Sequence, residues 1–192
     1  DAGVVSIATD HEGHRWCVVM SHESHNHPSQ IVPYEGAATG VGGNVRDVMC
    51  MGAEVIACTD SFRFGEINRN KTKWIHDGVV AGIAGYGNPL GIPNIAGDIY
   101  YHEGYNENCL VTLVTLGIVR EDHIIHSYAP KNADGYDLIL IGKPTDNSGF
   151  GGASFASLEL EEKKKEQNKG AVQEPNAFLE RHLLKSTYAL FN

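Results

Sequence analysis

Residues 23–29 read Glu-Ser-His-Asn-His-Pro-Ser, and residues 40–47 read Gly-Val-Gly-Gly-Asn-Val-Arg-Asp. Two histidines, an amide and a carboxylate within five positions cannot share one buried apolar face, because each group needs a hydrogen-bond or metal partner once it leaves water. Pro28 disfavours helical geometry at His27 and is expected to end any regular element there. The first stretch therefore predicts a catalytic loop, with a solvated loop of no function as the alternative. The second stretch predicts a helix that faces a ligand.

The composition indicates a soluble globular protein of one or two domains. Its 192 residues are 42% hydrophobic, which is enough to bury a substantial core. The net charge of -9 argues against nonspecific binding to nucleic acid or to a membrane surface, which needs a basic face. No signal peptide or membrane-length apolar run is present. The cysteines lie in apolar stretches without metal-ligand spacing, so buried thiols in a reducing cytoplasm are expected at Cys17, Cys50, Cys58 and Cys109.

Hydrophobic periodicity predicts a mixture of strands and helices. Strands are expected at residues 15–22, 53–59, 95–101 and 109–119, and helices at residues 36–51 and at about 76–86. The apolar run at 16–20 is too continuous for a strand with one exposed face. Two helical stripes are apparent, one of Val41, Val45, Val48 and Met49, and one of Phe178, Leu179, His182, Leu183, Leu184, Tyr188, Leu190 and Phe191.

The polar segment 129–135 is the best candidate for a domain boundary, since residues 137–141 are expected to open a new strand. We expect one domain over residues 1–130 and the start of a second over residues 131–192. The glycine-rich turn at 142–154 offers backbone N–H groups to an anion, or is simply a flexible turn. The charged run 159–169 predicts a solvated helix or a connector. Because the chain opens on Asp1 within an apolar segment and its last stripe runs almost to its end, a fragment or one piece of a split enzyme is expected.

The front of the chain is rich in histidine, which raises the question of a metal. A zinc-protease helix needs two histidines four positions apart, whereas His22 and His25 are three apart. Glu23 and Asp47 suit a harder cation, since Mg²⁺ is bound by carboxylate, phosphate and water oxygens. The alternative for Asp47 is a helix carboxylate that pairs with Arg46 or with a lysine.

Together these residues resemble one enzyme family, phosphoribosylformylglycinamidine synthase, the amidotransferase of purine biosynthesis. The resemblance covers nearly the whole chain, and the Glu-Ser-His-Asn-His-Pro motif is its most specific part. The matching segments, in the family's order, are residues 23–29, 33–34, 36–40, 42–43, 46–48, 51–53, 60–65, 91–97, 151–157 and 171–173.

The resemblance implies an α/β (α+β) fold of the aminoimidazole ribonucleotide synthetase type. An N-terminal sheet domain, which pairs with a sister domain, would be followed by the start of a C-terminal α/β domain. The implied reaction is an ATP-dependent amide activation: ATP phosphorylates the amide oxygen of formylglycinamide ribonucleotide, and ammonia from a glutaminase displaces phosphate to give the amidine. A cytoplasmic ligase that uses ATP and Mg²⁺ is expected.

The resemblance also implies roles for individual residues. Glu23 and Asp47 would bind Mg²⁺, and His25 would act as the proton acceptor. The substrate-binding residues would be Ser24, His25, Asn26, His27, Arg46 and Gln173. These roles suit the chemistry, since imidazole titrates near working pH and a guanidinium offers a planar fork to a phosphate or carboxylate.

The chain also departs from the family pattern. Ser21 stands where many relatives carry lysine, and a further His, a Tyr and a later Mg²⁺-binding Asp of the family have no counterpart here. Cys50 lies on a helical stripe and not at a strand-to-helix elbow, so it is not a glutaminase nucleophile. The chain is therefore expected to be inactive alone. Two alternatives stay open: a noncatalytic structural copy, and another member of the same ATP-dependent superfamily.

Overall fold

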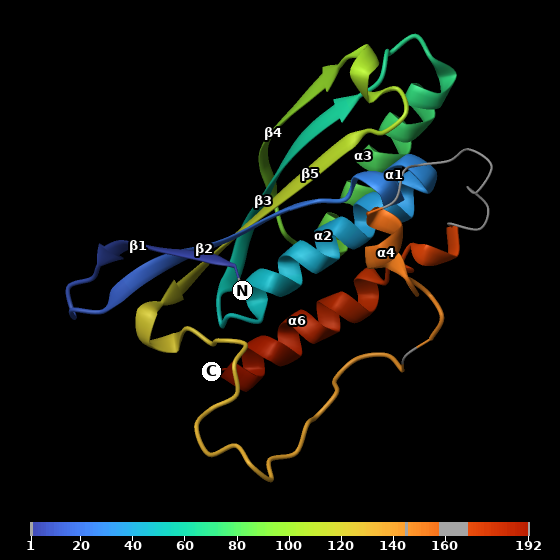
Figure 1. Ribbon diagram of the computed structural model, residues 1–192. Coiled ribbons are helices and arrows are strands. Elements are labelled where there is room, and N and C mark those ends of the chain that lie inside the picture. The colour runs from blue at the N-terminus through green and yellow to red at the C-terminus, as the bar shows by residue number, and fades with distance from the viewer. Residues whose placement is uncertain (1, 145, 158–168, 192) are drawn as a thin grey trace.

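The computed structural model describes residues 2–144, 146–157 and 169–191. They form one five-stranded sheet in the order β1-β2-β5-β3-β4, and the helices lie together on one of its faces (Figure 1). β3 and β4 run parallel with α3 between them in sequence, and the other neighbouring strands are antiparallel. The elements are β1 Gly3–Thr9, β2 Arg15–Ser24, α1 Asn26–Ile31, α2 Pro33–Met49, β3 Glu54–Phe64, α3 Asn70–Leu90, β4 Asn94–Tyr101, η1 Glu103–Tyr105, β5 Leu110–Arg120, η2 Glu121–His123, α4 Gly152–Ala156, η4 Lys169–Ala171 and α6 Ala177–Phe191.

The core lies between the sheet and α2, as the stripe on this helix predicts. Val41, Val45, Val48 and Met49 are all buried, whereas Arg46 and Asp47 are exposed on another face. Burying one valine side chain is worth about 1.5–3 kcal/mol, so the stripe fixes which side of α2 meets the sheet. Arg46 and Asp47 are thereby turned away from the core, whereas Asn44 of the same helix is buried.

β2 differs from the prediction of a strand covered on both faces. Cys17 and Val19 are buried against the helices, but Met20 is 47% exposed on the other face. Among the described residues the helices cover only one side of the sheet (Figure 1). The strand thus alternates as a half-covered strand does, despite its continuous apolar sequence.

The histidine-rich stretch does not form the loop that Pro28 predicts. β2 continues through Ser24, and α1 begins at Asn26, which leaves His25 between a strand and a helix. Pro28 lies in the first turn of α1, where its missing N–H group has no intrahelical partner to lose. The polar side chains of this stretch are therefore placed by two regular elements.

Other boundaries shift as well. α2 begins at Pro33, and α3 begins at Asn70 and runs through Pro89 to Leu90, where Gly91 ends it with a φ of 72°. The strand expected at residues 137–141 is wrong: these residues form no regular element, and Leu138 is fully exposed. No strand of the described residues pairs with them, so their backbone N–H and C=O groups have no neighbouring strand to bond with there. Most of the charged run 159–169 lies outside the described residues.

α6 packs back onto α2 and α3 (Figure 1). Its buried residues are Glu180 and Leu184, and Leu183 and Tyr188 pack against the core, whereas Phe178 and Leu190 of the predicted stripe are exposed. The stripe is therefore rotated from the one the apolar residues alone suggest, and it carries a carboxylate.

All four cysteines are free thiols. Cys17, Cys58 and Cys109 are buried as expected, but Cys50 is exposed because it follows the last turn of α2 on the face away from the sheet. In the described part of the chain, no helix is both long and apolar enough to cross a membrane.

Candidate active site

Three cavities meet at Glu23, near the end of β2. The first, of 460 Å³, lies between α2 and α6 and contains His25, Arg46 and Gln173 in its wall. The second, of 340 Å³, is lined by residues 23–28 and again by Gln173. The third, of 530 Å³, opens beside Ser21 and Asp47. Each site residue predicted from the sequence lines at least one of these three cavities. These residues are Glu23, Ser24, His25, Asn26, His27, Arg46, Asp47 and Gln173.

His25 is held in one tautomer. Its ring Nδ1 lies 2.5 Å from the carbonyl oxygen of Gly36, and because a carbonyl only accepts, Nδ1 must carry the proton. Nε2 of the neutral ring is then a free base. Burial lowers the pKa of His25 below its usual value, and the hydrogen bond to Gly36 opposes that shift only in part. An ideal Cβ on Gly40 would lie 3.1 Å from Cβ of His25, so the glycine permits this close packing against α2.

Asn26 and His27 are partly occupied by structural contacts. The side-chain oxygen of Asn26 accepts from the backbone N–H of Val111 at 2.8 Å, which ties the start of α1 to β5. The His27 ring meets Phe155 of α4 edge to face, with 5.9 Å between ring centroids. Ser24 is exposed at the end of β2. Asn26 therefore offers the site its NH₂ group, while its oxygen supports the fold.

Glu23 and Asp47 form a carboxylate pair between β2 and α2. Burial raises the pKa of Glu23, and the negative charge of Asp47 raises it further. Ser21 donates from Oγ to Asp47 Oδ2 at 3.1 Å, and an ideal Cβ on Gly43 would lie 3.7 Å from Glu23 Oε2. Asp47 is thus held by Ser21, and the described ion pair of Arg46 goes to Glu180 instead.

This pair suits a divalent cation, because a cation relieves the repulsion between two carboxylates and hard oxygen ligands are what Mg²⁺ prefers. Across the described ranges no group of three or more His, Cys, Asp or Glu side chains could hold a metal ion. Phosphate oxygens and water are the usual further ligands of Mg²⁺ beside one or two carboxylates.

Arg46 lies on the wall of the first cavity, where it is bound by a residue that the sequence did not nominate. Its Nη2 donates to Glu180 Oε2 at 2.5 Å and its Nε donates to Glu180 Oε1 at 3.4 Å. Gln173 lies against the glycine-rich turn, where an ideal Cβ on Gly149 would come within 2.6 Å of its Cγ. The signal for Glu180 was present in the sequence, since it precedes Leu184 and Tyr188 by four and eight residues on one helical stripe.

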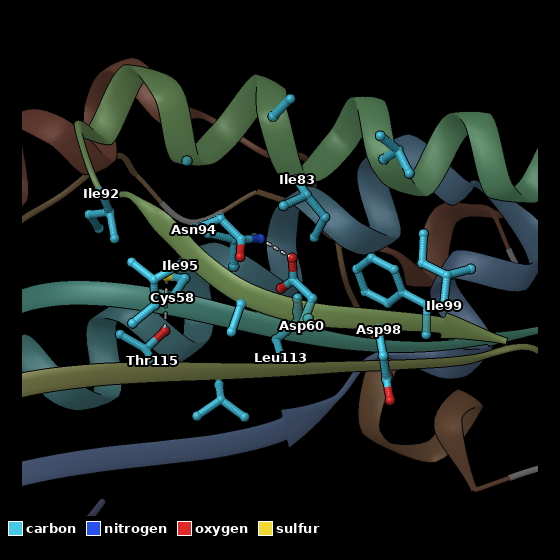
Figure 2. A pocket seen from close by; sticks show the side chains of 18 of the residues that line it. Cys58, Asp60, Ile83, Ile92, Asn94, Ile95, Asp98, Ile99, Leu113 and Thr115 are labelled. Atoms are coloured by element: carbon cyan, nitrogen blue, oxygen red, sulfur yellow. Dashed lines mark hydrogen bonds between the residues drawn. The ribbon is translucent and has the colours of Figure 1, made fainter.

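The largest of the described cavities, at 660 Å³, contains none of these residues. It lies between α3 and the edge strand β4, and Figure 2 shows Asp60 and Asn94 facing each other there beneath Ile83, whereas Asp98 points to the opposite side of the strand. Asn94 donates from its amide to the Asp60 carboxylate. Asp60 is only 8% exposed, and burial raises its pKa to about 6, against the opposing effect of the Asn94 hydrogen bond.

Asp60 should therefore cost stability at neutral pH. Its folded pKa of about 6 exceeds its ordinary value of 3.8, so its favourable contribution is complete below pH 4 and is lost as the pH rises through 6. Asp60→Asn removes this titration, so the free energy of unfolding of the variant should rise relative to that of the wild-type chain by about 2 kcal/mol between pH 4 and 7. Thermal unfolding of both chains across this range measures the difference.

Asp98→Asn is the matched control for Asp60→Asn. The Asp98 carboxylate accepts from Arg63, and this hydrogen bond lowers its pKa, so its contribution is present at neutral pH and is lost on acidification. The Asp98 variant should therefore change in the opposite direction. Equal pH trends in the two variants would contradict the account of Asp60.

The fold and the site together define an α+β domain whose polar cleft combines a carboxylate pair, an imidazole and an arginine. Comparison with known proteins places it more closely. The sequence profile of "AIR synthase related protein, N-terminal domain" matches residues 1–119. The chain belongs to this family, which confirms the fold class expected from the sequence.

Two relatives from different organisms carry the same description. The chain is 56% identical to phosphoribosylformylglycinamidine synthase subunit PurL of Methanothrix thermoacetophila, over 100% of the chain and 25% of that protein. It is 46% identical to the same subunit of Thermus thermophilus, over 97% of the chain and 25% of that protein. The chain thus spans about a quarter of the length of these curated relatives.

Solved structures agree. Thermotoga maritima PurL complexed with FGAR is similar with a TM-score of 0.81 and 35% identity, over 100% of this chain and 29% of that one. T. maritima PurL complexed with ATP is similar with a TM-score of 0.73 and 32% identity, over 100% of this chain and 27% of that one. The resemblance inferred from the motifs is therefore confirmed.

Proposed function

We propose that this chain is part of a synthetase that converts formylglycinamide ribonucleotide to formylglycinamidine ribonucleotide in de novo purine biosynthesis, with ATP and glutamine-derived ammonia. The observation that carries the proposal is the meeting of eight motif residues on three cavities joined at Glu23. The relatives support the proposal, since PurL of T. maritima is described with FGAR and with ATP. Because the chain spans a quarter of these relatives, the activity belongs to the longer enzyme.

The chemistry requires that the oxygen of the glycinamide carbonyl be made a leaving group, while the formyl group stays unchanged. ATP transfers its terminal phosphoryl group to that oxygen, ammonia attacks the carbon, and phosphate departs as the amidine forms. The nitrogen sheds a proton in this step. We assign its removal to Nε2 of His25, which is the unprotonated ring nitrogen when Nδ1 donates to Gly36.

Glu23 and Asp47 are the residues that would hold Mg²⁺. When bound, the ion supplies positive charge to the phosphate oxygens of ATP. The chain's own part is to keep the two carboxylates adjacent, through the Ser21 hydrogen bond to Asp47 and the glycine opposite Glu23. We place Ser24, Asn26 and His27 against the ribonucleotide in the second cavity, with Arg46 and Gln173 in the first.

The proposal also covers partners and organisation. A glutaminase subunit or domain would supply ammonia, and the uncovered sheet face, where Met20 is exposed, would pair with a sister domain. We keep the division into residues 1–130 and 131–192, because the family profile ends at residue 119 and the sheet ends at Arg120. We place the enzyme in the cytoplasm, without nucleic-acid or membrane partners.

The alternatives are a noncatalytic structural copy and another ATP-dependent enzyme of the superfamily. The full set of polar groups around Glu23 favours a working site over a degenerate copy. Activity needs the family's full length, so the assays below use a synthetase that contains this chain together with the rest of that length. Amidine formation from formylglycinamide ribonucleotide, in place of turnover with selenide, distinguishes the proposed function from the superfamily alternative.

Arg46→Lys is the first test of the substrate site. Lysine keeps the charge but loses the planar fork, so the ribonucleotide should lose about 1.5–3 kcal/mol of affinity while the KM for ATP stays unchanged. Gln173→Ala should show the same selectivity with a smaller loss. Steady-state kinetics with each substrate varied in turn measures both effects.

Arg69→Lys is the matched control, because Arg69 pairs with an exposed glutamate, Glu107, and lines none of the three cavities. Its kinetic constants should equal those of the wild type. If both site variants instead raised the KM for ATP and left the KM for the ribonucleotide unchanged, the assignments of the two ligand sites would have to be exchanged.

A further inference from the structure

The contact between Arg46 and Glu180 joins two elements that are far apart in sequence. Arg46 is on α2 and Glu180 is on α6, 134 positions away, and the two side chains meet through two hydrogen bonds along one edge of the guanidinium. Such a two-point contact fixes the plane of the guanidinium as well as its position. The contact is therefore a constraint on orientation, which a single ion pair at one nitrogen does not provide.

The two partners differ sharply in exposure. The Glu180 side chain is 2% exposed, whereas the Arg46 side chain is 52% exposed on the wall of the first cavity. The fixed partner is thus the carboxylate, and the arginine reaches from it into the cavity. A carboxylate this deeply buried needs partners for both oxygens, and Arg46 supplies one donor to each.

A second group lies beside Glu180. Burial of Tyr86 on α3, together with the nearby Glu180 charge, raises the pKa of Tyr86 to about 12. Tyr86 therefore keeps its proton at any working pH, and its hydroxyl is a donor available to the Glu180 carboxylate. An ideal Cβ on Gly42 would lie 2.8 Å from this tyrosine ring, so α2 has the space for it only because residue 42 is glycine. Three helices therefore converge on one carboxylate.

The guanidinium has further N–H donors that do not contact Glu180. Nε and Nη2 form one edge of the planar fork, and both donate to Glu180. The other edge, formed by Nη1 and the second N–H of Nη2, lies in the same plane and points about 120° away from the first. This second edge can bind an anionic group of a ligand in the cavity without releasing Glu180.

We infer that Glu180 is a positioning residue, which with Tyr86 locks Arg46 so that its second edge faces the ribonucleotide. The inference rests on the proposed function only for the identity of the ligand. Glu180 lines the same cavity, but both of its oxygens accept from Arg46, so it acts on the ligand through the arginine. Its negative charge also balances that of the arginine, so Arg46 recognises an anion by direction and not by excess charge.

The first experiment measures the lock without any substrate. In the 192-residue chain, the Nε–H proton of Arg46 should exchange slowly with water and give a resolved NMR signal. Glu180→Gln should raise its exchange rate at least about tenfold, because the amide group cannot accept at both positions. An equal exchange rate in the wild type and in Glu180→Gln would overturn the inference, whatever the function of the protein.

The second experiment measures the consequence in the complete synthetase. Glu180→Gln should raise the KM for formylglycinamide ribonucleotide about 10–100-fold and leave the KM for ATP within about twofold. Tyr86→Phe should cause a smaller rise in the KM for the ribonucleotide and none in that for ATP. Because it keeps both the Arg46 and the Glu180 charge, it serves as the test if Glu180→Gln folds poorly. Glu107→Gln is the control, because it removes an arginine-paired carboxylate at the surface.

A double-mutant cycle with Arg46→Met separates positioning from general support of the fold. If Glu180 acts through Arg46, the double variant should bind the ribonucleotide no more weakly than Arg46→Met alone. Additive losses, or equal losses for both substrates, would overturn the inference. Failure of the proposed function would give another result, because the wild-type synthetase would then make no amidine. The exchange rate of the Arg46 Nε–H would still decide whether Glu180 holds Arg46.

Discussion

Replacement of His25 by asparagine in the complete synthetase is expected to lower kcat for amidine formation by about 10²–10⁴-fold, the usual contribution of a general base. Asparagine can place an N–H close to that of Nδ1, so the hydrogen bond to the Gly36 carbonyl is kept while the basic Nε2 is removed. The fold should therefore survive a substitution that removes the chemistry. His25→Ala should reduce activity to a similar extent, and it also removes the hydrogen bond to Gly36.

The pH dependence gives an independent readout of the same residue. Burial lowers the pKa of His25 below its ordinary value of 6.5, so the neutral, basic form persists to a lower pH than for a free imidazole. Since a general base works above its pKa, the acid limb of the kcat profile should fall below pH 6.5. A limb at or above 6.5 would contradict the role of burial.

His11→Ala is the control for the loss of a histidine, because its side chain is 91% exposed at the turn between β1 and β2. It should leave turnover unchanged. Near-normal turnover in His25→Asn would remove His25 from the mechanism, and His27 or water would then take the proton.

Much of the fold follows from local sequence, because it is set by short-range periodicity. The stripe that includes Val45 and Val48 was sufficient to place α2 and its buried face. The strand order was not predictable in this way, since pairs such as Cys17 and Val119 are decided by contacts between distant segments. The exposed segment 137–141 failed for the opposite reason: its sequence favours a strand, but a strand also needs a partner.

The site shows the same division. The motif around His25 was recognisable, since polar groups crowded into a few positions demand partners or ligands. What holds those groups was not recognisable. Glu180 meets Arg46 across 134 positions, and Ser21 meets Asp47 across 26. Pro28 misled the local prediction because its effect depends on whether it stands before, within or at the start of a helix.

Glu23→Gln and Asp47→Asn should each lower ATP-dependent turnover by about 10²-fold or more at limiting Mg²⁺, because a metal-bound charge is worth several kcal/mol and each 1.4 kcal/mol is about a factor of ten. The neutral amides keep the shape of the side chains but remove a charged oxygen ligand. Raised Mg²⁺ should restore part of the activity by mass action. Turnover measured across a Mg²⁺ series, at fixed ATP, gives both the loss and the rescue.

The electrostatic coupling between the two carboxylates supplies a further test that needs no activity. Burial and the charge of Asp47 both raise the pKa of Glu23, so Asp47→Asn should lower that pKa toward its ordinary value of 4.5, and Mg²⁺ should lower it in the wild-type chain by favouring the ionised form. NMR titration of the labelled Glu23 carboxyl measures both shifts. Asp77→Asn is the control, because Asp77 is an exposed helix carboxylate that contacts His76 on α3 and should leave Glu23 unchanged. If neither Asp47→Asn nor Mg²⁺ changes the pKa of Glu23, the two carboxylates are independent surface groups, and the assignment of Mg²⁺ to them is wrong.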